Sequence, residues 1–455
     1  MSGADAGLDV TGQAAAREGF EALARALDGL LEGDEVYLAS FSGEDSDFVR
    51  FNRGEVRQAG AVTQRTLTLD LARGRRHASG TLTLAGDLEV DRPRLARLVR
   101  DLREVLGHLP EDPFFLYATE PRSSERTDAG ALPEGAAAVA AVQAAAQGRD
   151  LVGIWAAGAI HAGFASSLGQ RNWYSTRSFN LDWSFYHRAD KAVKAGYAGF
   201  TWDEAAFRRK VDWAGEQLRA VARPPRTISP GRYRVFLAPA AVHEVVSILC
   251  WDGFGLKAHR TKQTPFLKLV EGEARLDPRV TLVEHTAGGV APNFQEQGFL
   301  RPDAVPLLRA GGYAECLVSP RSAQEYGVAT NGASAGEAPE SLDLAAGDLP
   351  QAGALARLDR GIWVGNLWYL NYSDRSACRT TGMTRFATFW VEGGEVVAPL
   401  DVMRFDETVY RMLGDNLVAL TAERELILDA NTYGGRSTSS ARLPGALVDD
   451  FTFTL

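Results

Sequence analysis

Several stretches of the chain repeat apolar residues every three or four positions, which is the spacing that buries one side of a helix. In residues 11–32, Phe20, Leu23 and Leu27 follow this spacing, and Thr11 is suited to cap the first turn. An alanine-rich stretch adds a further helix, because alanine has the highest helix propensity. Beyond residues 11–32, we predict helices over residues 91–107, 136–147, 203–222 and 240–251.

Other stretches alternate apolar and polar residues between glycine-containing turns, which is typical of strands. Residues 35–86 alternate in this way and predict a meander of antiparallel strands. Residues 151–200 predict a second group of strands that carries many aromatic side chains. Beyond residue 231, brief β-rich runs follow one another between Gly, Asn and Asp turns, and Gly393-Gly394 marks a hairpin.

The segment RPPRTISPG, residues 223–231, separates two parts of different pattern. Its prolines forbid a continuous helix, and short strands dominate after it. We therefore predict an α+β protein of two domains. Residues 1–222 form an N-terminal α/β domain with an antiparallel sheet and helices, residues 223–231 a linker, and residues 232–455 a β-rich, barrel-like C-terminal domain.

Composition and charge exclude several classes of protein. The formal net charge of -9 opposes binding to nucleic acid, which needs a basic surface. The apolar runs fall short of a membrane span, and we expect no signal peptide. Cys250, Cys316 and Cys378 are odd in number and far apart, so they predict neither a disulfide framework nor a metal knuckle. A cytoplasmic location fits this cysteine usage best.

The stretch AVHEVVSILC contains half of a zinc-protease motif. A helix that binds zinc through two histidines places them at i and i+4, with a glutamate base after the first. Here His243 and Glu244 match the start, but Ser247 stands at i+4 and Ile248 at i+5. Either His243 is a hydrogen-bonded helix residue beside a core Cys250, or more distant ligands complete a site. The distant candidates are His259, His285 and Cys316.

The order of motifs after residue 230 resembles that of the TldD/PmbA family, in which zinc-dependent TldD subunits pair with metal-free TldE (PmbA) subunits. In the first half, the stretch FVRFNRGEVRQ resembles the early strand pair of the family, and the stretch NWYSTRSFNLDWSF resembles the later strand before its linker. In the second half the resemblance is carried by residues 241–248, 288–332, 361–405 and 431–455.

Position by position, the resemblance implies that most of the zinc site is missing. Ile248 stands at the place of the second histidine of the family's HExxxH motif. The third ligand in TldD subunits is a cysteine just before a glycine, and Tyr433 stands at that place. The resemblance therefore implies a TldE/PmbA-like subunit without a bound metal. Zinc is then expected only in a TldD-type partner.

The resemblance also implies a role. Family subunits pair around a chamber that admits unfolded or leader peptides, so we expect a dimer that forms this chamber and guides the peptide. In the strand-like run 361–372, a period of two places Asn366, Trp368 and Tyr372 on one side, and Trp363, Tyr369 and Asn371 on the other. Both sides mix aromatic rings with an amide, so the pattern does not tell which one is buried. We expect the Asn366 side, with Arg379 nearby, to face the peptide. Aromatic residues in a strand are otherwise core residues. The expected substrate-binding residues are Asn366, Trp368, Tyr372, Arg379 and Tyr433, and the remnant catalytic residues are His243 and Glu244.

One alternative remains open: a free-standing homodimeric hydrolase or peptidase with an altered site at His243 and Glu244. A serine hydrolase is disfavoured, because the STRS stretch at residues 175–178 has no nucleophile-elbow pattern and no evident base.

Overall fold

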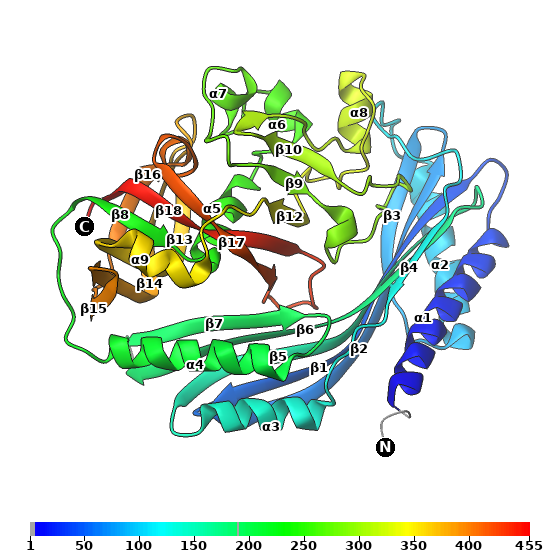
Figure 1. The fold of residues 1–455 in the computed structure, drawn as a ribbon. Coiled ribbons are helices and arrows are strands. Elements are labelled where there is room, and N and C mark those ends of the chain that lie inside the picture. Colours follow the sequence, from blue (N-terminus) through cyan, green and yellow to red (C-terminus); the bar gives the residue numbers. More distant parts are fainter. Residues whose placement is uncertain (1–4, 189–190) are drawn as a thin grey trace.

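The computed structural model describes residues 5–188 and 191–455. The N-terminal half of this described chain forms a seven-stranded sheet, in the order β3-β2-β1-β5-β6, with both β4 and β7 paired to β6 (Figure 1). All neighbours are antiparallel except β4 and β6. The strands are β1 (Val36–Asn52), β2 (Glu55–Arg73), β3 (Arg76–Thr83), β4 (Ser124–Asp128), β5 (Asp150–Ser166), β6 (Arg171–Arg188) and β7 (Lys191–Gly199).

The helices of this half cover one face of the sheet. In β1, Tyr37 and Phe41 pack in a cluster with the first two helices, and Val49 and Phe51 pack in a cluster with the next two. These residues share a face because side chains alternate along a strand, and β1 pairs with β5 without a bulge. The helices are α1 (Asp5–Asp28), α2 (Leu88–Leu106), α3 (Gly135–Ala146) and α4 (Glu204–Val221).

The opposite face of the sheet meets the C-terminal half. Leu38, Phe164 and Tyr174 on this face pack against Phe294 of the C-terminal half. The hydroxyl of Tyr174 donates to the carbonyl of Val290 at 2.8 Å. The two halves therefore contact each other through buried side chains as well as through the chain between α4 and β8.

The C-terminal half forms an eleven-stranded sheet within the described residues. Its central strands follow the order β18-β16-β14-β13-β8, and β18 also pairs with β8, so these strands close into a ring. The expected barrel-like architecture is thus confirmed. The strands are β8 (Gly231–Leu237), β9 (Leu282–Glu284), β10 (Val305–Arg309), β11 (Gly312–Tyr313), β12 (Ser341–Leu344), β13 (Gly361–Asp374), β14 (Arg379–Glu392), β15 (Glu395–Pro399), β16 (Arg404–Thr408), β17 (Leu417–Leu428) and β18 (Ser440–Phe453).

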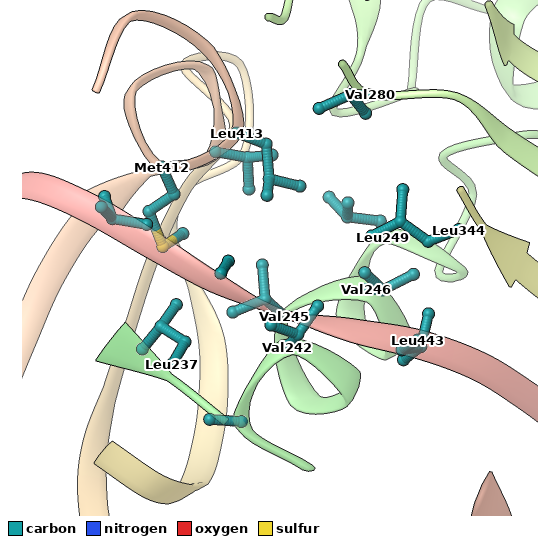
Figure 2. Close-up of a cluster of buried hydrophobic side chains, with 14 of the residues drawn as sticks. Leu237, Val242, Val245, Val246, Leu249, Val280, Leu344, Met412, Leu413 and Leu443 are labelled. Atoms are coloured by element: carbon teal, nitrogen blue, oxygen red, sulfur yellow. The ribbon is translucent and has the colours of Figure 1, made fainter. Parts of the chain in front are cut away.

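Helix α5 (Pro239–Leu249) packs its apolar side into the core of this half. Figure 2 shows Val242, Val245, Val246 and Leu249 pointing into a cluster of side chains from several strands and loops. These apolar residues follow one another at intervals of three or four positions, which is the spacing of one helix face and explains why the segment forms a helix. The polar residues of α5, including His243, are left outside this cluster. The remaining helices are short: α6 (Leu256–Arg260), α7 (Leu267–Val270), α8 (Pro320–Tyr326) and α9 (Ala354–Leu358).

The segment between the halves contains neither helix nor strand from residue 222 to residue 230. It begins after α4 ends at Val221 and stops where β8 begins at Gly231. No helix within residues 5–188 and 191–455 has the length and apolarity that a membrane crossing needs.

Candidate functional site: a cleft between the two halves

A cleft of about 940 Å³ lies between the N-terminal sheet and loops of the C-terminal half. Its lining is mostly polar, with amide and hydroxyl side chains from both halves. The N-terminal sheet contributes Ser40, Ser42, Glu44, Gln64, Thr66 and Thr68. The C-terminal half contributes Gln295, Glu296, Gln297, Arg301, Glu340, Asp429, Asn431 and residues 434–438.

The loop between β17 and β18 is tied to the N-terminal sheet. The backbone N–H of Arg436 donates to Glu44 Oε2 at 3.1 Å, and Gln64 Nε2 donates to the carbonyl of Gly434 at 3.0 Å. Gln64 also donates to Glu44 Oε1 at 2.5 Å. Two strands of the sheet thus hold one wall of the cleft in place.

The Arg436 side chain enters the sheet itself. Its Nη1 donates to the carbonyl of Gly158 at 3.0 Å, and its Nη2 donates to Ser178 Oγ at 2.6 Å and to the Ser178 carbonyl at 2.9 Å. Burial lowers the pKa of Arg436 to about 10, and Glu44 opposes that effect, so the guanidinium stays charged at neutral pH. Each of these acceptors lies on β1, β5 or β6, so the loop position depends on the sheet.

A glycine is required beside this guanidinium. Gly158 has φ +143, and a Cβ there would lie 2.1 Å from the carbonyl oxygen of Asp45. No larger residue fits at that distance without moving β1 away from β5. Close approach of these two strands therefore shapes the socket that receives Arg436.

His243 and Glu244 lie on α5 and outside the cleft lining. Ser247 Oγ is 3.3 Å from His243 Nε2, which agrees with the i and i+4 face expected from the sequence. Burial lowers the pKa of His243, against the charge of Asp429, so the imidazole is neutral at pH 7. Burial also raises the pKa of Glu244, which Lys194 opposes.

These residues do not fit a catalytic zinc ion. Such a site needs three protein ligands around the metal. Ile248 is 3% exposed and apolar, and Tyr433 is fully exposed at 100%. Among the residues with described positions, no group of three or more His, Cys, Asp or Glu side chains is placed to hold a metal. Of the distant candidates, His259 is already engaged, because its Nε2 hydrogen-bonds the carbonyl of Gly253 at 2.9 Å.

The prediction that Trp368 and Tyr372 share one side of β13 is wrong, because a register shift lies between them. Trp368 pairs with Met383 and Tyr372 pairs with Thr380, and the register shifts between Trp368 and Asn371. Paired residues point to the same face, and residues 380 and 383 point to opposite faces. Trp368 and Tyr372 therefore point to opposite faces. Tyr372 donates its hydroxyl to the carbonyl of Ile248 at 3.0 Å, on α5.

The other expected substrate-binding residues are also dispersed. Arg379 forms an ion pair with Asp406 at 3.4 Å, and Asn366 is half-buried. The lining of the cleft includes none of these four residues: Asn366, Trp368, Tyr372 and Arg379. Tyr433 comes closest, since Asn431 and Gly434 on either side of it line the cleft.

Sequence reasoning missed Arg436 and Glu44, which connect positions far apart in the chain. Local spacing carries no signal for such a contact. The nearest hint is the glycine pair before Arg436, because Gly435 has φ +152 and a Cβ there would lie 2.8 Å from Gln64 Nε2.

The structure also supplies a base for Ser175 of the STRS stretch, contrary to expectation. His161 Nδ1 is 2.9 Å from Ser175 Oγ, and His161 Nε2 is 3.1 Å from Asp45 Oδ2. Gln13 Nε2 donates to the same hydroxyl at 2.8 Å. Ser175 is 0% exposed, so no substrate carbonyl can reach its oxygen. This triad-like arrangement stabilises the sheet beneath α1 rather than forming an open hydrolase site.

Comparison with known proteins supports the fold described above. A sequence profile described as the PmbA/TldA metallopeptidase C-terminal domain matches residues 230–455. Curated proteins provide no significant match. The fold is similar to TldE from Thermococcus kodakarensis, with a TM-score of 0.76, 13% identity, and coverage of 96% of this chain and 100% of that one.

Two further solved structures are similar in fold. Both are described as candidate modulators of DNA gyrase. The one from Thermotoga maritima has a TM-score of 0.74 and 15% identity, and covers 95% of this chain and 99% of that one. The one from Bacteroides thetaiotaomicron has a TM-score of 0.72 and 16% identity, and covers 96% of this chain and 99% of that one. Through its C-terminal domain, the chain belongs to the PmbA/TldD family.

Proposed function

We propose that the chain is a TldE/PmbA-like subunit that works beside a zinc-binding TldD-type partner on unfolded or leader peptides. In this role it forms part of the chamber and guides peptide without binding zinc. The observation that carries the proposal lies on α5, the helix of His243: Ile248, at the place that the resemblance gives to the second histidine, is buried and apolar.

The cleft supports a guiding role. Its lining offers amides and hydroxyls that can both donate and accept hydrogen bonds, including Gln64, Gln297, Asn431 and Ser437. Such groups suit a peptide backbone of any sequence, because every residue presents the same N–H and C=O. Its charged groups are partly paired internally, as Arg301 pairs with Glu340 at 2.7 Å.

The proposed subunit has no hydrolytic step of its own. Neutral His243 faces Ser247, and within residues 5–188 and 191–455 no group of three or more His, Cys, Asp or Glu side chains could hold a metal, so we expect no metal-activated water on α5. The TldD-type partner would supply the zinc and the bond cleavage. Three dispersed cysteines fit a cytoplasmic assembly, and a dimer follows from the family's pairing.

Metal content and partner dependence test the proposal. The purified chain should contain no stoichiometric zinc by elemental analysis, and its metal content should not change in His243→Ala. Unfolded peptide should be cleaved only when a zinc-containing TldD-type subunit is added. One zinc per chain that disappears in His243→Ala would overturn the proposal.

The alternative, a free-standing homodimeric peptidase, gives the opposite result. It requires the chain alone to cleave peptide, and Glu244→Gln to abolish that activity. Ser247→Ala serves as a matched control on the same face of α5, since it removes the hydroxyl next to His243 and keeps the glutamate.

A further inference from the structure

A second surface outside the cleft has features that the fold does not explain. It consists of Trp368 and Tyr369 on β13 and Arg385 and Phe386 on β14, which we call the aromatic patch. Trp368 is 45% exposed and Tyr369 is 74% exposed. Their rings lie 5.4 Å apart, and the Arg385 guanidinium lies 4.5 Å above the Trp368 ring.

The backbone of the aromatic patch is strained. Tyr369 has φ 58 and Phe386 has φ 56, and both lie where the register between β13 and β14 shifts. A bulky residue in the left-handed region is strained, and a stable fold tolerates this strain only with compensation. Tyr369 gives little packing in return, because most of its surface is exposed.

The charge of the aromatic patch is uncompensated. Arg385 is exposed, and the ion pairs formed within the described chain leave it without a carboxylate. Nearby Arg379 does have one, Asp406 at 3.4 Å. Arg385 is instead held over Trp368 and lies 5.3 Å from the Phe386 ring. In a chain of net charge -9, this is a fixed cation on an apolar base.

We propose that the aromatic patch docks a peptide segment that carries a carboxylate next to a large apolar side chain. The carboxylate pairs with Arg385, and the apolar side chain packs on Trp368 and Tyr369. Charge complementarity identifies the occupant. The Arg385 guanidinium is a cation that the Trp368 ring already shields from water on one side, so it favours a partner with a carboxylate. Exposed rings, rather than an enclosed pocket, suit a polypeptide and not a small molecule. The patch lies outside the cleft, so the proposal goes beyond the proposed function.

Binding of short labelled peptides tests the proposal. Fluorescence anisotropy compares three peptides that differ only at a central pair: Asp-Phe, Lys-Phe and Asp-Gly, each flanked by Gly and Ser. The intact chain should bind the Asp-Phe peptide at least about tenfold more tightly than the other two, which is the effect of one good charged contact or one buried ring. Equal affinity for the three peptides would overturn the proposal.

Charge reversal gives the sharper test. Arg385→Glu should lose affinity for the Asp-Phe peptide and gain affinity for the Lys-Phe peptide, which general destabilisation cannot produce. Trp251→Ala removes another exposed tryptophan (58%), which is not part of the aromatic patch, and should leave both affinities unchanged. If Arg385→Glu instead dissolves a dimer of the chain and no peptide binds, the surface serves a second copy and the proposal fails.

Tyr369→Asn separates function from fold. Asn tolerates the left-handed conformation better than Tyr, so the variant should melt at an equal or higher temperature. Its affinity for the Asp-Phe peptide should fall about five- to tenfold, as expected for a lost aromatic contact. A lower melting temperature with unchanged affinity would show that the ring supports the fold and would overturn the proposal. These assays need no zinc-containing partner, so they stand or fall separately from the proposed function.

Discussion

Arg436 and Glu44 meet at the wall of the cleft, where the backbone N–H of Arg436 donates to the Glu44 carboxylate at 3.1 Å. This contact joins the loop before β18 to the middle of β1. The Arg436 side chain then continues past Glu44 to Gly158 and Ser178. One residue thus attaches the C-terminal half to three strands of the N-terminal sheet.

Replacing the Arg436 side chain should destabilise the protein. Arg436→Met keeps much of the volume but leaves buried acceptors at Gly158 and Ser178 unpaired, so the free energy of unfolding should fall by about 2–4 kcal/mol. Urea denaturation measures this change. Tyr433→Ala in the same loop is the control, because that side chain is fully exposed and should change stability little. An unchanged urea midpoint for Arg436→Met would contradict the assigned contacts.

Gly158→Ala should be strongly destabilising, by about 3–5 kcal/mol, because the new Cβ collides with backbone. The Cβ would lie 2.1 Å from the carbonyl oxygen of Asp45. Gly60→Ala is a matched control in the same sheet, since no atom lies within 4 Å of the new Cβ and the position is exposed. Circular dichroism melts compare the two. If both variants melt at the same temperature, β1 and β5 are not packed as closely as described.

Glu284 should make stability fall as the pH rises. Burial raises the pKa of Glu284 to about 7, against hydrogen bonds from the backbone of Ser341 and Glu340. Between the unfolded pKa near 4.5 and pH 7 the folded state binds more protons, so the free energy of unfolding falls across this range, by about 3 kcal/mol. Glu284→Gln should remove much of this slope. Melting temperatures at pH 5 and pH 8 measure it, and equal slopes in both proteins would contradict the prediction.

His77 should contribute a second, separable pH dependence. A hydrogen bond to Asp70, at 3.1 Å from Nδ1, raises the pKa of His77, although burial opposes the rise. A raised folded pKa means that the protonated form stabilises the fold. This contribution is complete below about pH 6.5 and is lost as the pH rises through the folded pKa.

The variant His77→Gln tests that contribution. Its melting temperature should change less between pH 5.5 and pH 8.5 than that of the unaltered chain. The double variant with Glu284→Gln should flatten the profile further, because the two groups lie in different halves of the protein and their effects should add. A His77→Gln profile that superimposes on the original would exclude His77 as a titrating contributor.

Local patterns predicted the elements well where burial follows a regular period. The stretch predicted as residues 11–32 is helical as Asp5–Asp28, so Thr11 lies inside the helix and does not cap it. The predicted helix 203–222 corresponds to α4, where Asp203 caps the first turn by accepting from the backbone N–H groups of Ala205 and Ala206. Cap signals of this kind leave the predicted start of a helix uncertain, because more than one residue near that start can act as the cap.

The candidate site was less accessible to such reasoning. A period of two cannot locate bulges, so it placed Trp368 and Tyr372 on one face when the register shift at Tyr369 puts them on opposite faces. The cleft wall depends on Arg436 and Glu44, which only the tertiary fold brings together. Counting positions did identify Ser247 as the neighbour of His243, because that contact lies within one helix.

The loop between β17 and β18 has a mechanical consequence. Its ends are fixed in the C-terminal ring of strands, and its middle is fixed to the N-terminal sheet by Arg436 and Gly434. A tether of fixed length cannot stretch, so the two walls of the cleft cannot swing apart like a hinge while these bonds persist. In the proposed role, this fixed width suits an extended, unfolded peptide better than a folded domain.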